Sequence, residues 1–203
     1  IILSPFLSKN TKIILRISGL PKLTFFRKFI WKNFSKYIYV ITTPTQITRD
    51  LLIKSKIFEE NKIKLLRDPV IEYAEIKNKK GIGIDKNFNN CKFYLSIGRL
   101  TKQKNFSFLI KIFSKHQKNF KTNKLLIIGE GEEKDKLLKL IKKNKMEKNI
   151  FLLGFKKNVY NYINSCEAII SVAQYEDPGF VLIEGAYLKK KIICSLVENG
   201  PLE

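Results

Sequence analysis

The sequence predicts an α/β fold built on a doubly wound parallel sheet. From Lys92 onward, short apolar runs alternate with helix-length segments, and this repetition is typical of strand–helix–strand units. The runs are almost continuously apolar, as expected for parallel strands that are covered on both faces. The composition agrees with a globular protein, because the 203 residues are 44% hydrophobic and 28% charged.

The second part of the chain is expected to hold five strands, with a helix after each of the first four. The strands are predicted over residues 93–98, 124–129, 149–155, 169–173 and 191–197, and the helices over 105–118, 132–145, 158–165 and 179–189. In such sheets, ligands bind beyond the carboxyl ends of the strands. The residues that directly follow each strand are therefore the first candidates for a functional site.

The first part is more mixed. Short strands are predicted over 1–3, 12–17 and 37–41, and Thr45 is expected to cap a helix that runs to about Ser55. The segment 20–37 predicts an amphipathic helix, because apolar residues recur at spacings of three and four between basic ones. The apolar set is Leu23, Phe26, Ile30, Phe34 and Tyr37, and the basic set is Lys22, Arg27, Lys28, Lys32 and Lys36.

A change of character over residues 68–91 predicts a domain boundary. Asp68-Pro69 signals a turn, and Gly81 and Gly83 interrupt a polar stretch. We therefore expect an α/β domain over 1–75, a linker over 76–91 and a second α/β domain over 92–203. The chain is expected to be a piece of a larger protein, with the second domain missing its last elements.

The charge needs an explanation, since 39 Lys and Arg against 18 Asp and Glu give +21. A nucleic-acid binder is one alternative, but the lysines are spread over the whole chain and no recognised nucleic-acid module is present. No apolar run approaches the roughly 20 residues that a membrane-spanning helix needs. With three cysteines and a single histidine, His116, a zinc cluster, a disulfide scaffold and a Ser-His-Asp triad are disfavoured, and a reducing, cytoplasmic setting is expected.

Two cations follow the first strand of the second domain. Gly98 allows a close turn of the backbone, and Arg99 and Lys104 can bind phosphate oxygens. In so lysine-rich a chain, cations near a loop also arise by chance. The next strand is followed by Gly129-Glu130-Gly131, half of a dinucleotide fingerprint, but its glutamates would repel a pyrophosphate, so we interpret it as a turn and helix cap.

The loop after the fourth strand carries the strongest site signal. Gly179 begins a helix whose first N–H groups can bind an anion. Glu176 lies in the loop before it, and Glu184 lies in the second turn of an otherwise apolar helix. A carboxylate in an apolar setting needs a partner, which can be a vicinal diol such as a ribose or a nearby lysine.

These residues resemble a known family. Glu176 and Glu184 with Gly179-Phe180 between them resemble the E-x7-E segment of retaining glycosyltransferases of family 4, which have the GT-B fold. GRLTKQKN, LLIIGEGEEKDKLLKLI and NIFLLGF resemble the preceding units in order and spacing. The resemblance covers about 92–203 well and 1–70 more loosely, and it implies a Rossmann-like donor domain preceded by the end of an acceptor domain.

The resemblance implies a role for each site residue. Gly98, Arg99 and Lys104 would bind the diphosphate of a UDP- or GDP-sugar, and Gly179, Phe180 and Val181 would offer backbone amides to phosphate or sugar. Glu176 would contact the transferred sugar, Glu184 the ribose, and Phe155 the base. Glu176, Arg99 and Lys104 would form the catalytic set.

The resemblance also implies an activity. The family transfers a hexose with retention to a glycan or lipid-linked acceptor without a metal or other cofactor, here in surface polysaccharide or glycoconjugate synthesis. The 203 residues alone are expected to lack turnover, since acceptor-side motifs are missing. Contact of 20–37 with an anionic membrane surface is a further hypothesis, against a core-packed helix with a solvated basic face. A nucleotide-sugar epimerase of the same fold is the remaining alternative.

Overall fold

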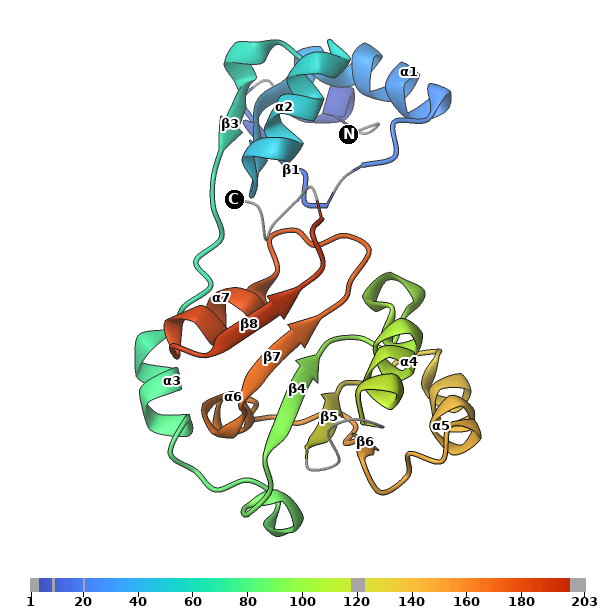
Figure 1. The fold of residues 1–203 in the computed structure, drawn as a ribbon. Helices are drawn as coiled ribbons and strands as arrows, with labels where there is room; N and C mark the ends of the chain where they lie inside the picture. The colour runs from blue at the N-terminus through green and yellow to red at the C-terminus, as the bar shows by residue number, and fades with distance from the viewer. Residues whose placement is uncertain (1–3, 9, 20, 118–122, 198–203) are drawn as a thin grey trace. The chain divides into compact units, whose positions relative to one another are not determined.

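The computed structural model describes residues 4–8, 10–19, 21–117 and 123–197. The chain forms two compact units (Figure 1). Among the described residues, the first unit comprises those up to Pro69 together with Glu176–Pro178, and the second comprises those of Val70–Tyr175 together with Gly179–Val197.

The second unit contains a five-stranded sheet in the order β6-β5-β4-β7-β8, and every neighbouring pair is parallel. The strands are β4 (Phe93–Ile97), β5 (Lys124–Ile128), β6 (Ile150–Leu152), β7 (Ala168–Ser171) and β8 (Lys191–Cys194). The helices are α3 (Tyr73–Lys79), α4 (Phe106–Gln117), α5 (Lys134–Lys143), α6 (Tyr160–Ser165) and α7 (Phe180–Tyr187). The predicted doubly wound parallel sheet is confirmed.

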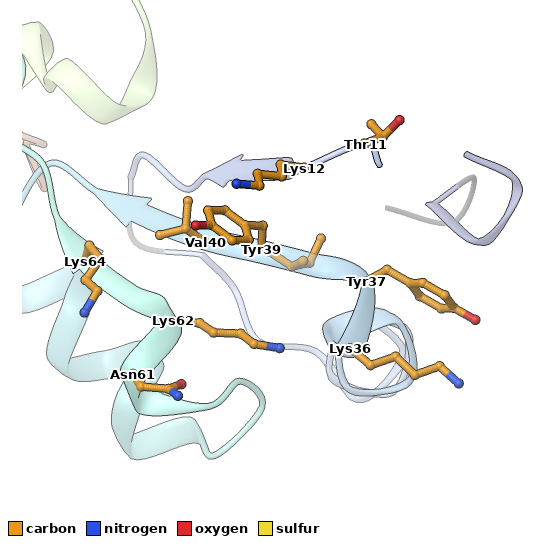
Figure 2. A pocket seen from close by; sticks show the side chains of 10 residues that line it. Thr11, Lys12, Lys36, Tyr37, Tyr39, Val40, Asn61, Lys62 and Lys64 are labelled. Atoms are coloured by element: carbon orange, nitrogen blue, oxygen red, sulfur yellow. The ribbon is translucent and has the colours of Figure 1, made fainter. Parts of the chain in front are cut away.

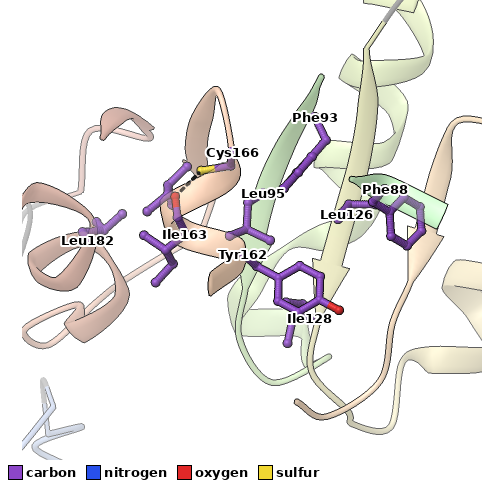
Figure 3. Packing of buried hydrophobic residues seen from close by; sticks show 10 residues of the cluster. Phe88, Phe93, Leu95, Leu126, Ile128, Tyr162, Ile163, Cys166 and Leu182 are labelled. Carbon is purple, nitrogen blue, oxygen red and sulfur yellow. Dashed lines mark hydrogen bonds between the residues drawn. The ribbon is translucent and has the colours of Figure 1, made fainter. Parts of the chain in front are cut away.

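Buried side chains on both faces of this sheet explain its almost continuous apolar runs. Along β5, Leu125 and Ile127 belong to the core cluster beneath α4 and α5, whereas Leu126 and Ile128 belong to the cluster beneath α6 and α7. Successive strand residues point to opposite faces, so a strand covered on both sides cannot alternate in hydropathy. Figure 3 shows the second of these clusters.

The segment 76–91, predicted to be a linker, is instead part of the second unit. Ile76 is buried on α3, and Phe88 is buried in the core cluster beneath α6 and α7. The side-chain amides of Asn158 and Asn161 donate to the carbonyls of Lys79 and Gly83, each at 3.0 Å. The prediction was wrong because Ile76 and Phe88, two isolated apolar residues of a polar, glycine-containing stretch, are enough to anchor this segment to the second unit.

The first unit contains a three-stranded parallel sheet in the order β1-β2-β3. Its elements are β1 (Ile13–Arg16), α1 (Phe25–Phe34), β2 (Ile38–Thr43), α2 (Gln46–Ser55) and β3 (Ile63–Leu65). The Thr45 hydroxyl accepts from the Thr48 N–H, as expected of a helix cap. β3 was not predicted, because a three-residue strand with Lys64 at its centre gives too short a pattern. The strand predicted over 1–3 lies outside the described residues.

The apolar stripe of α1 differs from the predicted one. Phe26, a member of the predicted apolar set, is 72% exposed, whereas the centre of the Trp31 ring lies 5.5 Å from that of the Phe58 ring. Many aromatics close together fit more than one stripe, and the one containing the large Trp31 ring packs against the core. Within the part of the chain that the structure describes, no helix has both the length and the apolar character to cross a membrane.

Replacing Gly129 by alanine should destabilise the second unit. Gly129 has φ 144°, and an added Cβ would lie 1.9 Å from the carbonyl oxygen of Gly98. We expect Gly129→Ala to lower the free energy of unfolding by at least about 2 kcal/mol in urea denaturation. Gly83→Ala is the control, because its Cβ would meet no atom within 4 Å. Equal stability of the two variants would contradict the close packing of these loops.

Candidate functional site

The loops after β4 and β7 meet at the carboxyl edge of the second sheet. β4 and β7 are hydrogen-bonded neighbours although β5 and β6 lie between them in sequence, so the winding of the sheet reverses at this point. The Gln174 N–H donates to the Gln103 carbonyl at 2.9 Å, and the Gln103 side-chain amide donates to the Tyr175 carbonyl at 3.0 Å. The crevice at such a reversal is where open α/β sheets bind ligands.

The predicted phosphate loop brings Gly98 and Lys104 together. A Cβ on Gly98 would lie 3.1 Å from Cε of Lys104, so the lysine stem passes directly over the glycine. The Leu100 N–H donates to the Glu130 carbonyl at 2.8 Å, which fixes the loop against its neighbour. The side chain of Arg99 is exposed between these anchored positions. The structure therefore places both predicted cations on a firmly held loop beyond β4.

One glutamate of the segment after β5 has a structural role. Glu133 is buried, and its carboxylate pairs with the ammonium of Lys136 at 2.6 Å. Its N–H donates to the Leu100 carbonyl at 2.9 Å, which ties the start of α5 to the phosphate loop. Gly129 and Gly131 both have positive φ values. The expected turn is present, although the Glu133 side chain does not cap the helix.

The start of α7 has the features expected of an anion site. Gly179 adopts the left-handed conformation with φ 86° as the residue before the helix, a conformation that glycine reaches without steric cost. Its carbonyl accepts from the N–H groups of Leu182 and Ile183. The amides of Phe180 and Val181 belong to the first turn, which offers no partner within the helix. These amides can hydrogen-bond an anion at this end of the helix.

Glu184 on α7 has a tyrosine as its partner. The Tyr160 hydroxyl on α6 donates to Oε1 of Glu184 at 3.2 Å, so the predicted alternative of a lysine partner does not apply to this bond. Burial raises the pKa of Glu184 above its usual value, the Tyr160 hydrogen bond lowers it, and the charge of Glu75 raises it. Burial and then the charge of Glu184 raise the pKa of Tyr160 to about 12.

Sequence reasoning missed Tyr160. It stands two positions before Tyr162, which is buried in the core, and both resemble core aromatics in the sequence. Its role depends on the packing of α6 beside α7, which brings together residues that are 24 positions apart. A local pattern carries no signal for such a pair.

Two predicted site residues remain, Glu176 and Phe155. Glu176 is in the loop between β7 and α7 and is grouped with the first unit. Phe155 follows β6 and is 75% exposed. β6 is separated from β4 by β5, so Phe155 lies further along the carboxyl edge than the loops after β4 and β7.

A hollow in the first unit has a different character. It has a volume of about 660 Å³, and Figure 2 shows the lysines and tyrosines around it. The Lys12 ammonium lies 4.7 Å from the centre of the Tyr39 ring, and the Lys36 ammonium lies 5.1 Å from that of Tyr37. None of the predicted site residues lines this hollow.

Comparison with known proteins identifies the family. Residues 75–203 match the model described as glycosyl transferases group 1. The chain belongs to this family. The chain is 29% identical over 208 residues to the uncharacterized glycosyltransferase MJ1059 of Methanocaldococcus jannaschii. This alignment covers 97% of the chain and 51% of the relative.

A second relative matches a shorter stretch of the chain. The N-acetylgalactosamine-N,N'-diacetylbacillosaminyl-diphospho-undecaprenol 4-alpha-N-acetylgalactosaminyltransferase of Campylobacter jejuni is 38% identical over 112 residues, 55% of this chain and 30% of that protein. The chain thus spans about half the length of the archaeal relative and less of the bacterial one.

A solved structure supports the GT-B fold. A variant of TarM from S. aureus, in complex with Fondaparinux, alpha-GlcNAc-glycerol and UDP, matches with a TM-score of 0.77 at 22% identity, covering 96% of this chain and 38% of that one. At this identity the likeness shows the fold. The match confirms the predicted family and gives no support to the nucleic-acid-binder or epimerase alternatives.

The raised pKa of Glu184 predicts a pH-dependent stability. A carboxyl with a higher pKa in the folded chain contributes most stability below its unfolded value near 4.5, and loses it as the pH rises through the folded value. Glu184→Gln keeps an acceptor for Tyr160 without the desolvated charge. We expect its free energy of unfolding, relative to wild type, to increase between about pH 4 and about pH 7.

Urea denaturation at both pH values provides the measurement. Glu132, which is exposed, supplies the control: Glu132→Gln should change the free energy of unfolding by a similar amount at both pH values. If the difference in free energy of unfolding between Glu184→Gln and wild type is the same at both pH values, the Glu184 carboxyl is not desolvated as described.

Proposed function

We propose that this chain supplies the nucleotide-sugar site of a retaining, metal-independent hexosyltransferase acting on a glycan or lipid-linked acceptor. The main support is the junction of the loops after β4 and β7, with Lys104 held across Gly98. The Campylobacter relative is named for transfer to a diphospho-undecaprenol-linked sugar, and the TarM structure contains UDP. Both favour a nucleotide-diphosphate donor and a glycoconjugate acceptor.

In this proposal the diphosphate binds between the two loops. Arg99 donates paired N–H groups to phosphate oxygens and Lys104 adds a compact charge. The amides of Gly179, Phe180 and Val181 complete the anion site. Glu184 accepts from the ribose hydroxyls, while Glu176 meets the hydroxyls of the transferred sugar and Phe155 the base of a UDP or GDP donor.

The chemistry follows from where negative charge develops. As the sugar–phosphate bond breaks, the leaving diphosphate gains charge, and Arg99 and Lys104 stabilise it in place of a divalent cation. The sugar is attacked by the acceptor hydroxyl on the face that the diphosphate leaves. A diphosphate oxygen takes the hydroxyl proton, so the configuration at the sugar carbon is retained without a protein base.

The phosphate role of Lys104 predicts a selective loss of affinity. Titration calorimetry or saturation-transfer NMR should show that Lys104→Ala weakens UDP binding about 10- to 100-fold, the range for one charged hydrogen bond, while binding of uridine stays unchanged. Lys102→Ala, an exposed lysine of the same loop, is the control. If Lys104→Ala and Lys102→Ala bind UDP alike, the phosphate role is wrong.

A peripheral membrane contact is a second proposal, motivated by α1. Phe25, Phe26 and Phe29 are 87%, 72% and 60% exposed, and Arg27, Lys28 and Lys32 on the same helix are exposed too. Exposed aromatic rings interleaved with cations suit an anionic lipid surface. Lys36, which follows the helix, adds its charge to those of Lys12, Lys62 and Lys64 around the hollow of Figure 2.

Flotation with phosphatidylglycerol vesicles tests this contact. Replacing Phe25, Phe26 and Phe29 by serine should abolish binding, because the rings supply the apolar anchor, and wild-type binding should weaken as salt is raised. A variant with Phe108→Ser and Ile112→Ser, which removes exposed apolar side chains of α4, should float like wild type. Undiminished flotation of the phenylalanine variant would remove the proposal.

A further inference from the structure

Tyr160 and Glu184 form a pair that the proposed donor contacts do not account for. The hydroxyl donates to Oε1 of the carboxylate at 3.2 Å, and both side chains are partly buried. We propose that Tyr160 is a positioning residue that fixes the Glu184 carboxylate so that its other oxygen, Oε2, accepts from the ribose of the donor. This inference rests on the proposed ribose contact of Glu184 and adds the group that orients it.

Tyr160 is well suited to orient another group, because its own position is fixed. It is the first residue of α6, and its N–H donates to Oδ1 of Asn158 at 3.1 Å. The Asn158 side-chain amide in turn donates to the Lys79 carbonyl at the end of α3, at 3.0 Å. The Tyr160 ring packs against the core cluster beneath α6 and α7. The phenol therefore has little freedom to follow a moving carboxylate.

The backbone of Glu184 is held as firmly. Gly185 is buried, and a Cβ there would lie 2.3 Å from Cδ1 of Ile169 on β7, so α7 lies close to the sheet. Leu182 on the same helix belongs to the buried cluster. With both backbones fixed, the remaining freedom of Glu184 lies in its side-chain torsions, which the Tyr160 hydrogen bond restricts.

The direction of this hydrogen bond determines how many further hydrogen bonds the Glu184 carboxylate can accept. A phenol donor occupies one acceptor site of a group that has about four, so Oε1 is satisfied without using up Oε2. Within the described part of the chain, no hydrogen bond engages Oε2. A ribose diol brings donors, and a desolvated carboxylate oxygen is the acceptor that it needs.

The α3 helix adds an electrostatic contribution to the pair. The charge of Glu75 acts on both Tyr160 and Glu184 and disfavours a second negative charge beside it. Glu75 is itself paired with Lys79 one turn further along α3, which limits that repulsion. A hydrogen-bond donor on Glu184 is therefore needed to hold its carboxylate in the charged, accepting form.

The test compares the binding of UDP and 2′-deoxy-UDP to the full chain by titration calorimetry. A site built to hydrogen-bond a hydroxyl discriminates strongly against the analogue that lacks it. We expect wild type to prefer UDP by about 10-fold or more, and Tyr160→Phe to weaken UDP binding about 3- to 10-fold while leaving 2′-deoxy-UDP binding unchanged. Tyr94→Phe, the same change on β4 where the ring packs against Phe113, should bind both ligands like wild type.

The outcomes separate this inference from the proposed function. If Glu184→Ala removes the preference for UDP and Tyr160→Phe keeps it, the positioning role is overturned and the ribose contact stands. If Tyr160→Phe weakens both ligands equally, the tyrosine has only a structural role and the inference fails. If wild type and Glu184→Ala show no preference, or if wild type binds neither UDP nor GDP, the proposed ribose contact is wrong and the inference falls with it.

Discussion

The pairing of β4 with β7 is the constraint on which the site depends. Leu95 faces Ile169 across this pair, and the Ser96 hydroxyl donates to the Ile170 carbonyl at 2.6 Å. Because the chain builds β5 and β6 on one side of β4 and returns to add β7 on the other, the loops that follow β4 and β7 leave the sheet side by side. Every cation, amide and carboxylate assigned to the nucleotide diphosphate lies on one of these loops or on the helix that follows.

Most of the second unit could be predicted from the sequence because burial on both faces leaves a strong local mark. Each strand there is an apolar run, and α4 carries a buried stripe of Leu109, Ile110 and Phe113. The end of α3 and the stretch after it left no such mark, since Lys79 and Gly83 accept hydrogen bonds from Asn158 and Asn161, which lie 79 and 78 positions further along the chain. Hence a segment that resembles a linker in the sequence became part of the core.

The positions of the candidate site's loops were predictable to the same degree and for a related reason. Gly98, Lys104, Gly179 and Glu184 follow strands in sequence, and the rule that ligands bind at strand ends is local. Tyr160 could not be found this way, because its partnership with Glu184 is created by the packing of one helix against another. On α1 the sequence indicated the amphipathic character, but the choice between alternative aromatic stripes was decided by how Trp31 packs against Phe58.

Only a few of the cations behind the net charge of +21 are assigned a binding role. Arg99 and Lys104 are assigned to phosphate, and the cations of α1 to a lipid surface. The most direct test of the central claim is an NMR map of amide shifts on addition of UDP. We expect the shifts to concentrate on residues 98–104, which follow β4, and on residues 179–184, at the start of α7. Shifts concentrated instead around Lys12, Tyr39 and Lys64 in the first unit would contradict it.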